Sequence, residues 1–363
     1  MPVFNLPSPL QSLATPLAAL AALGFASYAG AQDFAFTPQD GAALNAAIEA
    51  GEYGTVTSVL ILQEGEILHE AYFNGADAAM LHDTRSVTKT LTGYAVGAAI
   101  ADGHLSLETR VADFFPDYAD LIADDPRKAR ISVEDLLTMS SMLECDDWNQ
   151  FSRGNEERMY IVEDWTGFFW ALPVRGFPAW ATQPQDTEYG RAFSYCTAGV
   201  QLLGQTVERA VGEAFTDFVE ARIFQPLGIE NRNWPRNGEG DAHMGGGLRL
   251  DSRSLARLGE VQRLGGEAIL PESYTRASVT PQAQIPNTPD YEYGYLWWLM
   301  PYQLGETRYR AAAMTGNGGN RVMVLEEFGL TLVFTNTDYN TRTMHENASR
   351  FFTEQIVARL SEE

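Results

Sequence analysis

The chain has 363 residues, of which 45% are hydrophobic and 20% are charged, an ordinary composition for a globular protein with a large core. Its 48 acidic residues outnumber 25 basic ones, which gives a net charge of -23. Phosphate binding needs a basic face, so this charge argues against nucleic acid as a partner and is typical of a well-solvated surface.

Residues 1–31 carry no charge, and their apolar run leads to Ala29-Gly30-Ala31, an A-x-A cleavage pattern. We therefore expect a signal peptide over 1–31 and a periplasmic or secreted protein over 32–363. No Lys or Arg precedes the apolar run, so an uncleaved anchor is the alternative, against which Pro16 and the short apolar run argue. No later segment reaches the ~20 apolar residues that span a bilayer, so no stable membrane insertion is expected after signal removal.

The remaining elements follow in chain order. Residues 38–51 predict a short helix, and residues 55–75 predict two strands around the turn QEGE. Helical periods dominate from about 86 to 230, with Gly212 and Gly228 as C-terminal stops. Short apolar runs over about 290–337 predict strands, and a last helix is expected from Met344 to Leu360. The pattern predicts an α+β fold, in which N- and C-terminal strands form one antiparallel sheet, flanked by terminal helices, and a large helical region is inserted.

Several common catalytic signatures are missing from the sequence. No serine lies in a G-x-S-x-G frame, no phosphate-binding loop is visible, and the five histidines show no metal-ligand spacing. We therefore expect no metal and no cofactor.

The segment RSVTKTLTGYAVGAAIADG places Lys89 in the first turn of a predicted helix that begins near Ser86. A cation is disfavoured there by the helix dipole, and lysine is rare in this chain, since Lys128 is the only other one. A lysine at i+3 can reach the serine hydroxyl and, unlike arginine, can lose its proton and act as a base. The alternative is a helix-capping Ser86 beside an exposed Lys89.

Several blocks beyond this S-x-x-K pair resemble the serine β-lactamase and penicillin-binding-protein superfamily. FSYCTAGVQLLG resembles its Y-x-N block, MGGGLRLDSRSLARLG a glycine-rich block, and AAAMTGNGGNRVMVLEEFGLTLVFTN the strand pair that carries K-T-G. The resemblance spans residues 40–363 in the family's order and is nearest to class C-like esterases and 6-aminohexanoate-dimer hydrolases. It implies a β-lactamase-like fold.

The resemblance also implies roles for individual residues. Ser86 would be the nucleophile, Lys89 its base and Tyr195 the second acid/base, and the backbone N–H groups of Ser86 and Asn317 would form the oxyanion hole. Thr197, Met314, Thr315 and Gly316 would border the substrate.

Two departures from the family pattern narrow the expected substrate. Thr197 stands where the family often has Asn, and Met314 stands where the K-T-G lysine would bind a substrate carboxylate. A thioether makes no charge-assisted bond, so neutral esters and small amides are favoured.

Nine aromatic residues lie between Trp148 and Trp180; most of them are expected in the core, and Trp148 is the candidate for the substrate pocket. Cys145 and Cys196 are the only cysteines. They can form a disulfide in an exported protein, or remain separate buried thiols. If the family blocks that hold them border one cleft, a disulfide would brace it.

The predicted function is an exported serine hydrolase that cleaves a neutral ester or small amide through an acyl-enzyme. A β-lactamase or D-alanyl-D-alanine peptidase, a hydrolase of linear aminohexanoate amides, and a non-catalytic ligand sensor on the same scaffold are the alternatives. The sequence does not indicate an oligomeric state.

Overall fold

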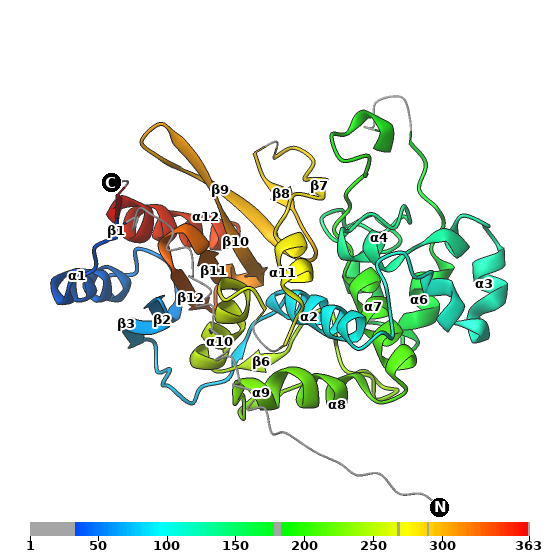
Figure 1. The fold of residues 1–363 in the computed structure, drawn as a ribbon, viewed down its shortest axis with the longest axis horizontal. Coiled ribbons are helices and arrows are strands. Elements are labelled where there is room, and N and C mark those ends of the chain that lie inside the picture. The colour runs from blue at the N-terminus through cyan, green and yellow to red at the C-terminus, as the bar shows by residue number, and fades with distance from the viewer. Residues whose placement is uncertain (1–32, 178–182, 267–268, 289, 362–363) are drawn as a thin grey trace, which may run out of the picture. The chain divides into compact units, whose positions relative to one another are not determined.

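The computed structural model describes residues 33–177, 183–266, 269–288 and 290–361 (Figure 1). The expected signal peptide, 1–31, lies outside these residues. Among the helices that are described, none is both long and apolar enough to cross a membrane.

The centre of the fold is an eight-stranded antiparallel sheet with the strand order β3-β2-β12-β11-β10-β9-β8-β7. Its strands are β2 (Val56–Gln63), β3 (Glu66–Tyr72), β7 (Ala283–Gln284), β8 (Glu292–Tyr293), β9 (Trp298–Leu304), β10 (Thr307–Gly316), β11 (Asn320–Leu325) and β12 (Leu330–Asn336). The N-terminal hairpin joins the C-terminal strands where β2 pairs with β12, Leu330 opposite Gln63. The α+β prediction is confirmed. The C-terminal part of the sheet begins with β7, earlier than the predicted residue 290. The sequence did not indicate β7 because this strand is only two residues long and shows no apolar run.

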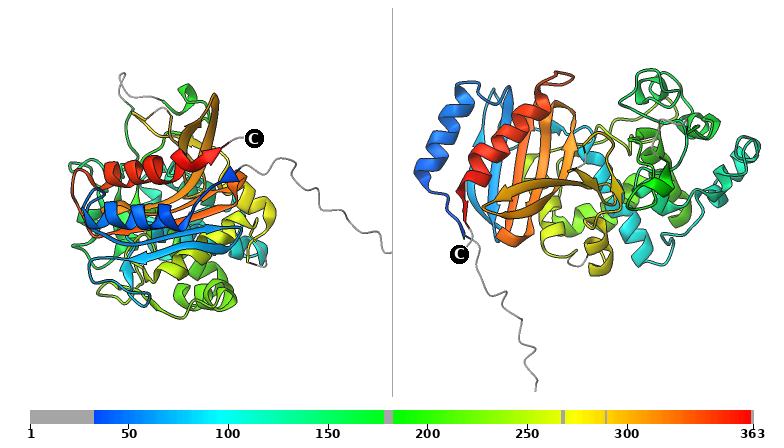
Figure 2. Two further views of the ribbon diagram at one scale, coloured as in Figure 1. Left: turned by 90° about the vertical axis from the view of Figure 1, so that its left-hand side faces the viewer. Right: turned by 90° about the horizontal axis from the view of Figure 1, so that it is seen from above.

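Two helices from opposite ends of the chain, α1 (Pro38–Glu49) and α12 (Met344–Phe351), lie side by side against one face of the sheet (Figure 2). Alternate strand residues, such as Ala311 and Ala313, pack toward them. Intervening residues, such as Ala312 and Met314, share the other core with α2 (Val87–Ala101) and α10 (Ser252–Arg263). The period of two along each strand therefore divides the core into two layers.

The inserted helical region contains α3 (Ala119–Ala123), α4 (Val133–Leu137), α5 (Glu156–Met159), α6 (Trp165–Ala171), α7 (Thr197–Val211), α8 (Phe215–Val219) and α9 (Gln225–Leu227). Gly212 and Gly228 cap α7 and α9 in the left-handed conformation, as predicted. Helices continue beyond residue 230 as α10 and α11 (Glu272–Ser278). Short 3-10 and π turns cover Val111–Phe114, Pro116–Tyr118, Lys128–Arg130, Pro184–Asp186, Glu220–Phe224 and Glu326–Phe328.

The end of the chain differs from the single helix predicted over Met344–Leu360. The α-helix stops at Phe351, a π turn and a 3-10 turn follow over Phe352–Ile356 and Val357–Arg359, and β13 (Leu360–Ser361) pairs with β1 (Asp33–Phe34). A second small sheet, in the order β4-β6-β5, contains β4 (His82–Asp83), β5 (Arg232–Asn233) and β6 (Arg249–Leu250). Its strand β4 leads directly into the start of α2.

Candidate active site

Ser86 stands at the N-cap position of α2, immediately after a residue with unusual backbone geometry. Arg85 has a φ of 51°, in the left-handed region that non-glycine residues seldom adopt. The Ser86 side chain makes no capping hydrogen bond, so its hydroxyl is available for other contacts. Strained backbone of this kind is common at functional sites.

Lys89 lies inside the protein because α2 is buried on all sides from Val87 to Ala99. Its side chain is 1% exposed, and its Nζ lies 3.0 Å from Ser86 Oγ and 2.6 Å from the Gly245 carbonyl oxygen. Burial lowers the pKa of Lys89, while the charges of Glu156 and Asp147 oppose that shift. Among the described residues no carboxylate lies within ion-pair distance of Nζ, so the amine can exist uncharged and accept a proton.

The other lysine, Lys128, is equally buried but has a different environment. Its Nζ donates to the carbonyl oxygens of Leu121 at 3.0 Å and Trp170 at 2.6 Å, which belong to α3 and α6. Asp124 Oδ2 also lies 4.0 Å from this Nζ. These contacts fit a structural role, in which the lysine side chain satisfies carbonyl groups near helix ends.

Tyr195 precedes α7 and faces both residues of the pair. A hydrogen bond links its hydroxyl to Ser86, and its ring centroid lies 5.0 Å from Lys89 Nζ. Burial raises the pKa of Tyr195 far above its usual value, which outweighs the lowering effect of the Ser86 hydrogen bond. The site thus holds a protonated phenol beside an amine whose pKa is lowered, an arrangement suited to an acid and a base.

Asn317 follows the end of β10, and a glycine brings that end against the start of α2. A Cβ on Gly316 would lie 2.2 Å from the Thr84 carbonyl oxygen, so only glycine allows this approach. The Asn317 side chain donates to Asn340 Oδ1 at 2.7 Å, and its Oδ1 accepts the Asn340 N–H at 2.8 Å. Gly316, the residue before Asn317, therefore lies against Thr84 and Arg85, just before Ser86, and the oxyanion role of Asn317 stays a prediction.

The segment Met314–Gly316 extends past β9, since the last β9–β10 pair is Trp298 with Ala313. Met314 is buried in the apolar core, so no cation occupies this position. The buried Thr315 Oγ1 has no partner among the described residues. Beyond Ala313, β10 therefore keeps its pairing with β11 and has no partner residue in β9.

Trp148 covers Tyr195. The two rings are stacked with centroids 5.6 Å apart and planes 6° apart, and Trp148 remains 55% exposed. A disulfide joins Cys145 to Cys196 and so ties the loop that carries Trp148 to the residue after Tyr195. A backbone hydrogen bond of 2.9 Å from the Asp147 N–H to the Tyr195 carbonyl reinforces that connection.

Thr197 is completely buried and does not reach the open part of the site. Its hydroxyl instead contacts two carboxyl groups, Asp147 Oδ2 at 2.8 Å and Glu156 Oε2 at 2.9 Å. Sequence reasoning did not find these two acids or the Gly245 carbonyl. The glycine-rich block indicated the region of Gly245, but a backbone carbonyl leaves no residue signature.

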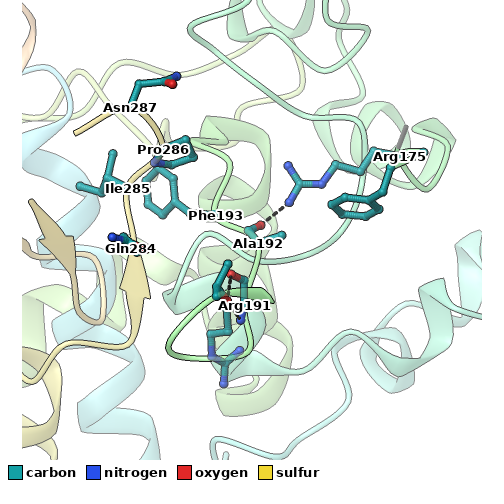
Figure 3. Close-up of a pocket in the computed structure, with 11 residues that line it drawn as sticks. Arg175, Arg191, Ala192, Phe193, Gln284, Ile285, Pro286 and Asn287 are labelled. Atoms are coloured by element: carbon teal, nitrogen blue, oxygen red, sulfur yellow. Dashed lines mark hydrogen bonds between the residues drawn. The ribbon is translucent and has the colours of Figure 1, made fainter. Parts of the chain in front are cut away.

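The rings of Trp148, Phe193, Tyr195 and Trp298 form an aromatic cluster. A cavity of about 520 Å³ adjoins this cluster (Figure 3). Phe193 belongs to both, because its ring contacts Trp148 and also lines the cavity. Ile285 and Pro286 add apolar wall, and the Arg175 guanidinium reaches across to the Ala192 carbonyl. The cavity therefore has an apolar wall and is also lined by two arginines, Arg175 and Arg191, of which Arg191 is paired with Glu134 and Asp135.

The sequence matches the Beta-lactamase family over residues 45–352. It is 25% identical to the 6-aminohexanoate-dimer hydrolase of Paenarthrobacter ureafaciens over 68% of this chain and 64% of that protein, and 29% identical to esterase EstB of Burkholderia gladioli over 47% and 45%. The chain thus spans less than two thirds of the length of these curated relatives. The octameric penicillin-binding protein homologue from Pyrococcus abyssi shares the fold, with a TM-score of 0.63 and 18% identity over 88% of this chain and 79% of that one. Because that family model matches residues 45–352, most of the chain, this chain belongs to the beta-lactamase family.

Proposed function

We propose that this protein is an exported serine hydrolase that cleaves neutral esters or small amides through an acyl-enzyme on Ser86. The observation that carries the proposal is the buried Lys89 amine, 3.0 Å from the Ser86 hydroxyl, with a pKa lowered by burial. Two relatives support this reaction class by name, one an esterase and one a dimer hydrolase.

The proposed reaction uses three side chains and two backbone groups. Ser86 Oγ attacks the carbonyl carbon while Lys89 Nζ takes its proton, and the Ser86 and Asn317 N–H groups stabilise the oxyanion. Tyr195 donates its proton to the leaving oxygen or nitrogen and regains one from the Lys89 ammonium. Water then attacks the acyl-enzyme with Lys89 again as the base, which releases the acid and restores Ser86.

The expected substrate is uncharged near the scissile bond because Met314 is apolar and buried. A carboxylate placed beside it would lose its hydration without gaining a charge-assisted bond. The exposed face of Trp148 and the adjoining apolar cavity suit a hydrocarbon or aromatic substituent.

The second candidate function is a β-lactamase or D-alanyl-D-alanine peptidase, which would use the same acyl-enzyme on Ser86 with Lys89 as the base. It differs in requiring recognition of a carboxylate. A non-catalytic sensor would leave Ser86 without an acyl adduct.

The test combines short-chain p-nitrophenyl esters, nitrocefin and a fluorophosphonate. We expect ester turnover, a single phosphonyl adduct by intact mass, and neither signal in Ser86→Ala. Turnover of nitrocefin faster than that of the esters would favour the second candidate. A folded wild-type protein with no adduct and no turnover would refute the proposal.

A further inference from the structure

A pair of carboxyl groups, Asp147 and Glu156, lies behind the site, bridged by one hydroxyl. Thr197 Oγ1 is 2.8 Å from Asp147 Oδ2 and 2.9 Å from Glu156 Oε2, and Thr197 is fully buried. A hydroxyl has one hydrogen to donate. If both carboxyl groups were ionised, one of these two oxygen–oxygen contacts would lack a hydrogen and be repulsive. The spacing therefore requires one further proton, held by the pair.

The other contacts of the pair are hydrogen bonds that N–H and O–H groups donate to it. Asp147 Oδ2 also accepts the Thr197 N–H at 2.7 Å, and Asp147 Oδ1 accepts the Glu156 N–H at 2.9 Å. Glu156 Oε2 accepts the Tyr160 hydroxyl at 2.9 Å. With one proton added, every short contact has a donor and an acceptor. Burial, followed by the charge of Glu156, raises the pKa of Asp147 to about 7, in agreement with this count.

The pair is adjacent to the base. Thr197 packs on Gly245, since a Cβ there would lie 2.8 Å from Thr197 Cγ2, and the Gly245 carbonyl accepts from Lys89 Nζ. The charges of both acids act on Lys89 and on Tyr195. Lys89 is an ammonium while it holds the Ser86 proton, and a fixed negative charge at the pair favours that state.

The remaining titratable groups around the pair do not offer a competing cation. Burial raises the pKa of Tyr160 and lowers the pKa of His243 to about 3, so both are neutral at working pH. The groups that face the pair or its immediate contacts are Lys89 from α2, Tyr195 before α7, Tyr160 after α5, His243 against the Tyr160 ring, and the exposed Glu157. Lys89 is thus the group whose charge the pair balances.

We propose that Asp147 and Glu156 share one proton through Thr197 and together act as a single negative charge that positions and balances Lys89 during proton transfer. The proposal rests on the proposed function for its kinetic consequence, but the shared proton itself does not. Both acids are positioning residues, because they act through Lys89.

The test uses infrared spectroscopy and pH–rate profiles on Glu156→Gln, on the double variant Asp147→Asn/Glu156→Gln, and on Glu157→Gln as the matched control. A glutamine oxygen can still accept from Thr197 and Tyr160, so Glu156→Gln preserves the contacts. At pH 6 we expect a protonated-carboxyl band in the wild type and in Glu157→Gln. In Glu156→Gln we expect this band to titrate away at lower pH, because the charge of Glu156 no longer raises the pKa of Asp147.

For kinetics, Glu156→Gln keeps one negative charge, so kcat/KM for an ester should stay within about fivefold of the wild type. The double variant keeps none, so the acid limb of its profile should move about one unit to lower pH and kcat should fall about tenfold. A band that titrates at the same pH in Glu156→Gln as in the wild type would overturn the shared proton. A folded double variant whose acid limb lies at the same pH as that of Glu156→Gln would overturn the proposed effect of the pair on Lys89.

The proposed function and the shared proton are tested by separate measurements. If the wild type hydrolyses no ester, the proposed function fails while the infrared band still decides whether the pair shares a proton. If the double variant is unstable, the isosteric Glu156→Gln still tests the proposal through its infrared band and its pH–rate profile. A loss of activity beyond fiftyfold in Glu156→Gln would contradict the proposal.

Discussion

The approach of β10 to the start of α2 predicts a large effect for the smallest substitution available, Gly316→Ala. The added Cβ would lie 2.2 Å from the Thr84 carbonyl oxygen, whereas ordinary contact begins at 3.4 Å, so the two backbones must separate by about 1.2 Å. Thr84 and Asn317 lie on opposite sides of this contact, so the separation displaces the Asn317 N–H from the oxyanion position.

A misplacement of about 1 Å or the loss of one oxyanion donor costs about 100-fold in rate, which is about 2.7 kcal/mol of barrier. We therefore expect kcat for a p-nitrophenyl ester to fall about 100-fold in Gly316→Ala. Gly238→Ala is the control, because its Cβ would meet nothing nearer than Glu163 at 3.5 Å. A Gly316→Ala protein with a wild-type melting temperature and a kcat within threefold of the wild type would refute this reasoning.

Three further predictions follow from the same site. Lys89→Arg should lower kcat/KM about 1,000-fold because a guanidinium does not accept the serine proton, while Lys128→Arg should keep kcat per folded molecule; equal activity in the two variants would contradict the base assignment. Replacing Cys145 and Cys196 by Ser opens a loop with a sequence separation of 51, and in the chain-entropy model this should lower the free energy of unfolding, measured by urea denaturation, by about 4 kcal/mol. An unchanged midpoint would argue against this stabilisation, and two alkylatable thiols in the wild type under non-reducing conditions would argue against the disulfide. Trp148→Ala should raise KM for aryl esters about tenfold with little change in kcat, and a loss confined to kcat would instead assign Trp148 to holding Tyr195.

The contact between the proposed nucleophile and the proposed base was predictable from the sequence because it is local. Ser86 and Lys89 are three residues apart at a helix start, and helix geometry alone brings such side chains together. The α+β arrangement was equally readable, since long apolar runs such as β2 and β12 are distinctive.

The groups that surround the base were not predictable, because they come from segments that are separate in the sequence. Asp147 and Glu156 are two acids among 48, and only the fold places both on the Thr197 hydroxyl. The two-residue strands β7 and β8 carry no periodicity that a sequence could reveal. The helix predicted up to Leu360 ends early because β13 pairs with β1, a contact between positions more than 300 residues apart.

That pairing has a practical consequence for rearranging the gene. Asp33 and Phe34 pair with Ser361 and Leu360, so a short linker could join residues 33 and 361. New termini could then be opened at Gly75, in the exposed loop between β3 and β4, where nothing packs against the glycine. Such a circular permutant would keep the start of α2 and the end of β10 on one uninterrupted polypeptide.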